Sequence, residues 1–373
     1  MRLRYWHLCQ PLLVKVCLFL IGVFIFCEHF VYQLVLWQCN WPASPESINN
    51  IKAIFIADTH LLGPFRGHWF DKLRREWQMY KTFQTAVALH QPEHIFVLGD
   101  LLDEGQYVGG EDFDNYVRRF YSLFSTPDGT ELHVVPGNHD MGFHYRLHPY
   151  LNDRFSRAFN SSMVKLLSIK GSYFVLINSM ALEGDGCFLC KPAQDRISLI
   201  SAKLKCSRKD RECPKSMKLG SYSQPIILQH FPLYRESDEE CSGPDSAPDI
   251  EKRKKFRQRW ECISKESTDM LLDYLNPRLV IDGHTHNGCH KYHAYGKVHE
   301  YTVPSFSWRN KNNPSFLMGI ISPDHFNISK CYMPEETTVL LIYAVSIILV
   351  IIYSVYKIKS RTIYIRKYSS HMK

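Results

Sequence analysis

The segment IKAIFIADTH, residues 51–60, is an apolar run that ends in an aspartate and a histidine. The same arrangement recurs in HIFVLGD, residues 94–100, and in ELHVVPGNHD, residues 131–140. Two later apolar runs end at His230 and at GHTH, residues 283–286. Runs of this kind are typical of buried strands. Because strand ends gather at one edge of a layered α/β fold, we expect the polar residues of these loops to meet there.

The residue types in these loops are those that bind divalent transition metals. A mixture of carboxylate, imidazole and amide oxygen favours Mn, Fe or Zn over Ca or Mg. No cysteine joins the set, which argues against a structural zinc site. Taken singly, His230 could be an ordinary core histidine and residues 137–140 a simple turn. Their joint occurrence predicts a metal centre in which one aspartate bridges two ions.

In their order along the chain, the motifs D-x-H, G-D-x-x-D, G-N-H-D, H and G-H-x-H resemble those of the calcineurin-like metallophosphoesterase superfamily. The resemblance implies an α/β fold, a four-layer β-sandwich flanked by helices, with the site at the strand edge. It also implies a metal-dependent phosphoesterase, a hydrolase acting on a phosphodiester. The implied metal ligands are Asp58, His60, Asp100, Asn138, His230, His284 and His286.

The resemblance also assigns a role to each position. The first metal would be held by Asp58, His60 and His286, and the second metal by Asn138, His230 and His284. Asp100 would bridge both metals. His139 would be the catalytic histidine, oriented by Asp103. Two cations lower the pKa of a water molecule between them, so hydroxide is available near neutral pH. A protonated His139 can donate to the departing alkoxide.

One position departs from the protein serine/threonine phosphatase branch of the superfamily. That branch has arginine after the second aspartate of G-D-x-x-D, where this chain has Glu104. We expect an acid there to repel a phosphate dianion. The departure therefore favours a phosphodiester, with one negative charge, over a phosphomonoester.

Three further segments, residues 177–190, 228–243 and 303–316, resemble a member of the superfamily that remodels GPI anchors. The likeness implies an Mn-dependent enzyme, with Zn or Fe as alternatives, that removes ethanolamine phosphate from the second mannose of GPI anchors. GPI-anchored proteins would be its substrates and their cargo receptors candidate partners, and the reaction would aid transport from the endoplasmic reticulum to the Golgi. The expected location is the exit sites of the endoplasmic reticulum, the intermediate compartment and the Golgi. His371 and Ser369 stand where that enzyme has a dilysine retrieval signal, so retrieval is in question.

Two other functions stay open. The superfamily fold hosts many activities, so the chain could be a luminal or surface phosphoesterase for another phosphodiester or a nucleotide. It could also be a catalytically dead membrane binding module or cargo adaptor, although a protein of that class has no need to keep every ligand.

Both ends of the chain carry apolar segments about long enough to cross a bilayer. Residues 337–356 contain no charge, whereas residues 16–37 are interrupted, and a signal peptide, an uncleaved anchor and an interfacial helix compete there. No small-residue cleavage site follows, which favours the anchor. The flanks, residues 1–15 and 357–373, are basic. The positive-inside rule therefore places both termini in the cytoplasm and a domain of residues 38–336 in the lumen.

The charge distribution argues against a nucleic-acid partner. Residues 39–336 carry 36 basic and 36 acidic side chains, so the net charge of +8 belongs to the membrane flanks. Nucleic-acid binders need a basic face. The basic run at residues 252–255 is better explained as the solvated face of a helix than as a phosphate-binding patch.

The segment between the spans has features of an oxidising lumen. Eight cysteines lie between residues 187 and 331, an even number that permits disulfides of undefined connectivity. The pair Cys187 and Cys190 is expected to form a structural disulfide rather than a redox or metal site. Asn160 and Asn327 lie in glycan acceptor triplets, and Asn327 is the poorer candidate because a span follows closely.

Hydrophobic patterning also predicts the remaining elements. Strands are expected at residues 172–179, 225–230, 278–283, 298–303 and 316–322, and helices at residues 77–90, 112–124 and 251–274.

Overall fold

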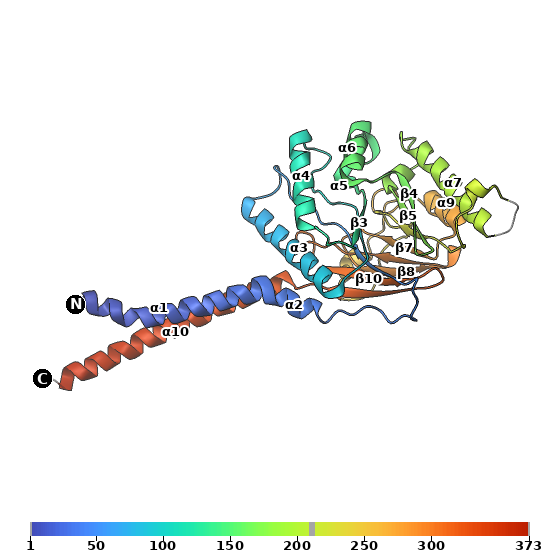
Figure 1. The fold of residues 1–373 in the computed structure, drawn as a ribbon. Helices are drawn as coiled ribbons and strands as arrows, with labels where there is room; N and C mark the ends of the chain where they lie inside the picture. Colours follow the sequence, from blue (N-terminus) through green and yellow to red (C-terminus); the bar gives the residue numbers. More distant parts are fainter. Residues whose placement is uncertain (1, 209–212, 372–373) are drawn as a thin grey trace. The chain divides into compact units, whose positions relative to one another are not determined.

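The computed structural model describes residues 2–208 and 213–371, which form two compact units (Figure 1). The larger unit comprises residues 36–333, and the smaller one comprises residues 1–35 and 334–373. Met1 and residues 372–373, the outermost parts of the predicted cytoplasmic flanks, lie outside the described residues.

Two mixed β-sheets form the centre of the larger unit. The first has the order β11-β10-β1-β2-β3, in which β1, β2 and β3 are parallel. The second has the order β4-β5-β6-β7-β9-β8, in which β5, β6, β7 and β9 are parallel and the two edge strands are antiparallel. The strands are β1 (Ile51–Ile56), β2 (His94–Leu98), β3 (Glu131–Val135), β4 (Val164–Ile169), β5 (Ser172–Ile177), β6 (Ile226–Leu228), β7 (Leu279–Asp282), β8 (Cys289–His293), β9 (Val298–Thr302), β10 (Ser315–Ile321) and β11 (Phe326–Tyr332).

Helices cover the outer faces of the sheets (Figure 1). The α-helices of the larger unit are α3 (Trp69–His90), α4 (Gly110–Leu123), α5 (Asn138–Met141), α6 (Pro149–Phe159), α7 (Cys190–Ser207), α8 (Asp249–Lys252) and α9 (Lys265–Leu275). Short 3-10 turns are η2 (His144–Arg146), η3 (Ser179–Leu182), η4 (Lys215–Met217) and η5 (Tyr295–Lys297).

Three hydrophobic cores define four layers in this unit. One core joins the facing sides of the two sheets, where Phe96 stacks on Phe55 and on Phe174. A second core packs the first sheet against α3, α4 and α6, and a third packs the second sheet against α7 and α9. The predicted helix–sheet–sheet–helix sandwich is therefore confirmed.

The strands predicted before the polar loops are confirmed, but the helix predicted at residues 251–274 is wrong in its first half. α8 ends at Lys252 and α9 begins at Lys265. Residues between them form a loop, in which the carbonyl of Trp260 lies 2.7 Å from His284 Nε2. A contact between distant parts of the chain thus replaces the helical hydrogen bonds that the local pattern suggested.

The smaller unit is helical. It contains α1 (Arg2–Ile25), a π-helical turn η1 (Phe26–Phe30), most of α2 (Val31–Leu36) and α10 (Glu336–His371). Among the described residues, two segments are long and apolar enough to cross a membrane, Leu12–Leu36 and Glu336–Ile363, with mean hydropathies of 2.2 and 2.6. α1 and α10 pack on each other, and the Tyr343 hydroxyl donates to Glu28 (2.6 Å). A partnered acid of this kind is tolerated within a membrane helix pair.

Disulfides in the larger unit join cysteines of the described residues in four pairs: Cys39–Cys331, Cys187–Cys190, Cys206–Cys213 and Cys241–Cys289. The expected disulfide between Cys187 and Cys190 is present. The eight cysteines from Cys187 to Cys331 do not pair only among themselves, because Cys331 bonds to the earlier Cys39. Cys262 therefore remains a free, buried thiol.

Candidate metal centre

The five polar loops follow the carboxyl ends of β1, β2, β3, β6 and β7. Because β1 to β3 are parallel in one sheet, and β6 and β7 are parallel in the facing sheet, these loops meet at one edge of the sandwich. All predicted site residues come together there: Asp58, His60, Asp100, Asp103, Asn138, His139, His230, His284 and His286.

The backbone is left-handed at five of these residues. Asp58, His60, Asp100, His284 and His286 have φ angles of 54°, 43°, 48°, 72° and 62°. Residues other than glycine seldom adopt such angles, at a cost of about 1–3 kcal/mol each. Strain of this kind concentrates at functional sites, where the surrounding fold holds the residues in place.

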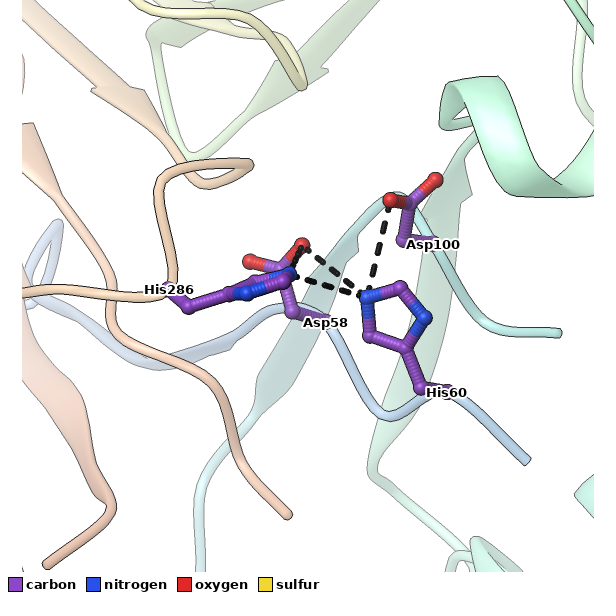
Figure 2. Close-up of side chains that lie close together, drawn as sticks. All are labelled: Asp58, His60, Asp100 and His286. Carbon is purple, nitrogen blue, oxygen red and sulfur yellow. Dashed lines mark hydrogen bonds and ion pairs between the residues drawn. The ribbon is translucent and has the colours of Figure 1, made fainter. Parts of the chain in front are cut away.

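Figure 2 shows the first group, in which Asp58, His60, Asp100 and His286 point toward one another. His60 Nε2 lies 3.0 Å from His286 Nε2 and 3.6 Å from Asp100 Oδ2. Asp58 Oδ1 lies 3.8 Å from His60 Nε2 and 3.6 Å from His286 Nε2. This buried oxygen accepts no hydrogen bond from the described residues. Its convergence with two imidazole nitrogens fits a metal whose bonds to N and O are about 2.0–2.2 Å.

The second group shares Asp100 with the first. Asp100 Oδ2 lies 3.3 Å from His230 Nε2, which in turn lies 3.2 Å from Asn138 Oδ1 and 3.2 Å from His284 Nδ1. The other oxygen, Oδ1, accepts the backbone N–H of His139 at 2.8 Å. A single carboxylate oxygen therefore faces both histidine groups, which is the arrangement that a bridging ligand requires.

Two motif glycines allow this close approach. A Cβ atom at Gly137 would lie 2.2 Å from Asp100 Oδ1, and one at Gly283 would lie 2.8 Å from Asp58 Oδ2. Neither position can carry a side chain without displacing a carboxylate of the centre.

Asp103 contacts His139 mainly through its backbone. His139 Nδ1 lies 2.9 Å from the Asp103 carbonyl oxygen but 3.9 Å from its carboxylate. The carboxylate lies closer to His60 Nδ1, at 3.2 Å, and to Arg309 Nη2, at 2.8 Å. The main chain of Asp103 thus orients His139, whereas its side chain links His60 to Arg309.

The Glu104 carboxylate is bound by backbone groups of the chain itself. Its carboxylate is buried and accepts the backbone N–H groups of Phe65 (3.1 Å) and Arg66 (2.6 Å). The structure thus gives the Glu104 carboxylate a role in holding the loop before α3, so its presence at this motif position is not in itself evidence for repulsion of a phosphate dianion. The preference for a diester loses that support.

The protonation states also suit metal binding. Burial lowers the pKa of His60, lowers that of His284 to about 3 and holds that of His286 well below its usual range, so these imidazoles are neutral, the form that binds metals. Burial alone would raise the pKa of Asp100, but the positive charges of His230 and His139 hold it well below its usual range. Asp100 is therefore ionised, with neutral His60, His284 and His286 around it. Burial would lower the pKa of His230, but the charge of Asp100 raises it to about 9, so this imidazole carries a proton that a bound metal would displace.

Two neighbouring residues of the centre were not predicted as parts of it. The Trp260 carbonyl fixes the His284 ring, and Arg309 pairs with Asp103. Arg309 falls in the segment of residues 303–316, and the resemblance of this segment and its polar stretch after Trp308 are the signals in the sequence that point to it. Trp260 lies in the segment that was expected to be helical.

The comparisons with known proteins agree with this geometry. A family model described as calcineurin-like phosphoesterase matches residues 51–288. The chain is 47% identical to Metallophosphoesterase 1 of Gallus gallus over 347 residues, which cover 89% of this chain and 86% of that protein. It is 45% identical to Metallophosphoesterase 1 of Rattus norvegicus over 367 residues, which cover 94% and 92%.

Solved structures show a more distant likeness. A purple acid phosphatase from yellow lupin seeds has a TM-score of 0.47 at 10% identity and matches 80% of this chain and 56% of that one. A dimetal phosphatase from Danio rerio has a TM-score of 0.44 at 14% identity and matches 77% and 99%. These two likenesses are too remote to add to the assignment.

The family match spans every motif of the centre, and the curated relatives align over about nine tenths of the chain. The buried aspartates and histidines form the dimetal type of site that is typical of the family. The chain therefore belongs to the calcineurin-like phosphoesterase family and is a metal-dependent phosphoesterase.

Proposed function

We propose that this protein is a dinuclear-metal phosphodiesterase of the early secretory pathway that removes ethanolamine phosphate from the second mannose of GPI anchors. The observation that carries the chemistry is the single oxygen, Asp100 Oδ2, that faces His60 on one side and His230 on the other. Residues 177–190, 228–243 and 303–316, which resemble a GPI-remodelling enzyme, support the substrate.

The ligand roles follow from the two groups around Asp100. One metal would be held by Asp58, His60 and His286 and the other by Asn138, His230 and His284, with Asp100 available to both. The mixed oxygen and imidazole donors fit Mn, and Zn or Fe would also fit. When bound, the two ions supply a hydroxide nucleophile near neutral pH and neutralise charge on the phosphoryl oxygens.

His139 protonates the leaving group. Its Nδ1–H donates to the Asp103 carbonyl, which fixes the ring and leaves Nε2 to the substrate. Burial would lower the pKa of His139, but the charge of Asp100, together with Asp103 and Asp140, raises it above its ordinary value. The imidazolium can therefore donate a proton to the departing alkoxide oxygen. In this scheme no side chain forms a covalent bond to phosphorus.

The domain arrangement fits a membrane-anchored substrate. The two candidate spans would hold the unit of residues 38–336 on the luminal side, with residues 1–15 and 357–373 in the cytoplasm. GPI-anchored proteins would be substrates and their cargo receptors partners, at endoplasmic reticulum exit sites, in the intermediate compartment and in the Golgi. Disulfides such as Cys39–Cys331 and Cys241–Cys289 are compatible with an oxidising lumen.

The test uses cells that lack this protein. Wild type and Asp100→Ala are re-expressed, and released GPI glycans are analysed by mass spectrometry. We expect only the wild type to remove the ethanolamine phosphate on the second mannose. If neither chain changes the glycan while the purified wild type hydrolyses simple diesters with Mn, the substrate is a different phosphodiester, which is the alternative function. If Asp100→Ala restores the cells that lack this protein as fully as the wild type does, the result would support a non-catalytic adaptor and contradict the proposal.

A further inference from the structure

The loop before α3 and the first turns of that helix expose large apolar side chains. Phe65, Trp69, Phe70 and Leu73 expose 71%, 68%, 55% and 59% of their surfaces. Trp69 and Phe70 lie edge to face, with ring centroids 5.7 Å apart. Isolated exposed apolar residues are ordinary, but four within nine positions form a patch of the kind that marks an interaction site.

These side chains are not needed for the core. α3 packs against the first sheet with a different face, on which Met79, Phe83 and Ala86 are buried. A helix that covers a sheet normally presents polar side chains on its outer face. The first turns of α3 are apolar on the outer face as well, which indicates a second partner for the helix.

Positive charge accompanies the apolar side chains. Residues 65–75 contain one acidic side chain, Asp71, and four basic ones, Arg66, Lys72, Arg74 and Arg75. Arg75 pairs with Asp71 at 3.3 Å. Trp, Phe and Leu combined with Lys and Arg are the composition of segments that lie in the headgroup region of membranes, where the rings enter the interface and the cations meet lipid phosphates.

A short, tightly packed loop connects the patch to the metal centre. Phe65 follows His60 by five positions, and its backbone N–H is held by Glu104, the neighbour of Asp103. The loop is tightly packed at Gly63, where a Cβ atom would lie 2.2 Å from Glu104 Oε2. A partner of the patch would therefore lie close to the edge of the sheets that carries the metal centre.

We propose that residues 65–73 form a membrane-contact surface that lies in the headgroup region of a phospholipid bilayer and holds the metal centre near membrane-anchored substrates. The chain's own candidate spans, Leu12–Leu36 and Glu336–Ile363, would anchor this protein in a bilayer. A phospholipid surface uses the aromatic, aliphatic and cationic side chains together. The surface goes beyond the proposed function, because it would serve any phosphodiester anchored in a membrane.

The first experiment measures contact directly. The full chain is reconstituted in phosphatidylcholine and phosphatidylserine vesicles, with a coumarin amino acid in place of Trp69 or, as a matched control, in place of Tyr295. Tyr295 is 56% exposed but lies in the η5 turn, far along the chain from the patch. We expect brominated acyl chains to quench most of the coumarin fluorescence at position 69 and none at position 295. Aqueous iodide should quench the fluorescence at position 295 and not at position 69. Equal quenching of both positions by iodide, with no effect of bromine, would overturn the proposal and leave a protein partner as the occupant.

The second experiment measures the consequence and rests on the proposed function. The triple variant Trp69→Ser, Phe70→Ser and Leu73→Ser is compared with wild type on a GPI-anchored protein in the same vesicles and on soluble bis(p-nitrophenyl) phosphate. We expect about a tenfold loss on the membrane substrate, with turnover of the soluble diester unchanged. Equal turnover of both substrates by variant and wild type would contradict the surface. If the wild type hydrolyses neither substrate, the proposed function fails, while the quenching result still decides the membrane contact.

Discussion

At the scale of single residues, Asp103 connects the metal centre to a part of the chain that the motifs do not include. Its carboxylate lies between His60 Nδ1 and Arg309 Nη2, at 3.2 Å and 2.8 Å. A charge-assisted contact on the far nitrogen of a metal-binding imidazole fixes the ring and its tautomer. Arg309 is therefore expected to act on the metal through Asp103 and His60.

Replacing Arg309 tests this chain of contacts. Arg309→Met should weaken metal binding or lower turnover by about 10- to 100-fold, because the Asp103 carboxylate loses its partner and His60 its orientation. Metal retained after dialysis and the rate of diester hydrolysis are the measurements. Arg253→Met is the matched control, since Arg253 is exposed and lies 3.9 Å from Glu239. Equal metal retention and rate in the two variants would contradict a positioning role for Arg309.

The residues of the centre differ in how far the sequence could predict them. The aspartates and histidines at strand ends were predictable, because each lies in a short motif after an apolar run. Glu104 was misjudged, since its motif position said nothing about the backbone N–H groups of Phe65 and Arg66 that it accepts. Trp260 was not predicted because it contacts His284 through its main-chain carbonyl, a group that every residue type carries.

At the scale of elements, a buried ionic network supports the strands behind the centre. The Arg235 side chain is fully buried and contacts Asp238 Oδ1 at 2.8 Å and Glu300 Oε2 at 3.1 Å. Glu300, on β9, also lies 2.9 Å from His293 Nε2 and accepts the backbone N–H of Leu233 at 2.6 Å. The network therefore ties the segment after β6 to β8 and β9.

Removing the cation from this network should be costly. Arg235→Met leaves buried acids without a counter-charge and should lower stability by about 3–5 kcal/mol. Adding Glu300→Gln should recover part of the loss, because it removes one of those charges. Thermal unfolding in detergent measures both variants, again with Arg253→Met as the surface comparison. A double variant less stable than Arg235→Met would show that the loss has another cause.

The stability of the larger unit should depend on pH through His133. Burial, with the nearby charges of His94 and Lys165, lowers the pKa of His133 on β3 to about 4. The unfolded chain therefore binds the proton more tightly, and this stability is complete above about pH 6.5 and is lost as the pH falls toward about 4. Between about pH 7 and about pH 5 the wild type should lose about 1–2 kcal/mol more than His133→Phe. Parallel unfolding curves for the two chains over this range would contradict the assignment.

The elements were predictable where local pattern and final packing agree. β1, β2, β5 and β7 are buried on all or nearly all positions, as continuous apolar runs indicate. β4, β8 and β11 were not predicted, because each is an edge strand whose exposed, mixed residues are ordered by pairing with one neighbour. The local pattern of the loop between α8 and α9 resembles that of a helix. Its contact with His284, which follows β7, joins residues 24 positions apart, so the local pattern does not reveal it.

At the scale of the whole molecule, the Cys39–Cys331 disulfide joins the first and last parts of the larger unit. It closes 292 positions of sequence. In the chain-entropy account, the stabilisation by a disulfide grows with the length of the loop that it closes. This bond therefore restrains the unfolded chain far more than Cys187–Cys190, which spans three positions.

Luminal placement of the larger unit is tested by glycosylation. Asn160 is exposed at the end of α6, where its acceptor triplet is accessible, whereas Asn327 is half-buried within β11. We expect an endoglycosidase-sensitive glycan that is lost in Asn160→Gln and retained in Asn327→Gln. The topology would be contradicted by a chain that carries no glycan in its natural form but gains one when an acceptor triplet is engineered into the residues after the second span. That result would place the tail in the lumen.

If two metal ions share Asp100, the metal content of the purified full chain depends on this one carboxylate. Wild type and Asp100→Ala are loaded with Mn, desalted and measured by plasma mass spectrometry together with hydrolysis of a soluble diester. We expect about two ions per wild-type chain, at most about one in the variant, and hydrolysis by the wild type alone. If the variant keeps both ions and its activity, Asp100 is not the shared ligand of a dinuclear centre.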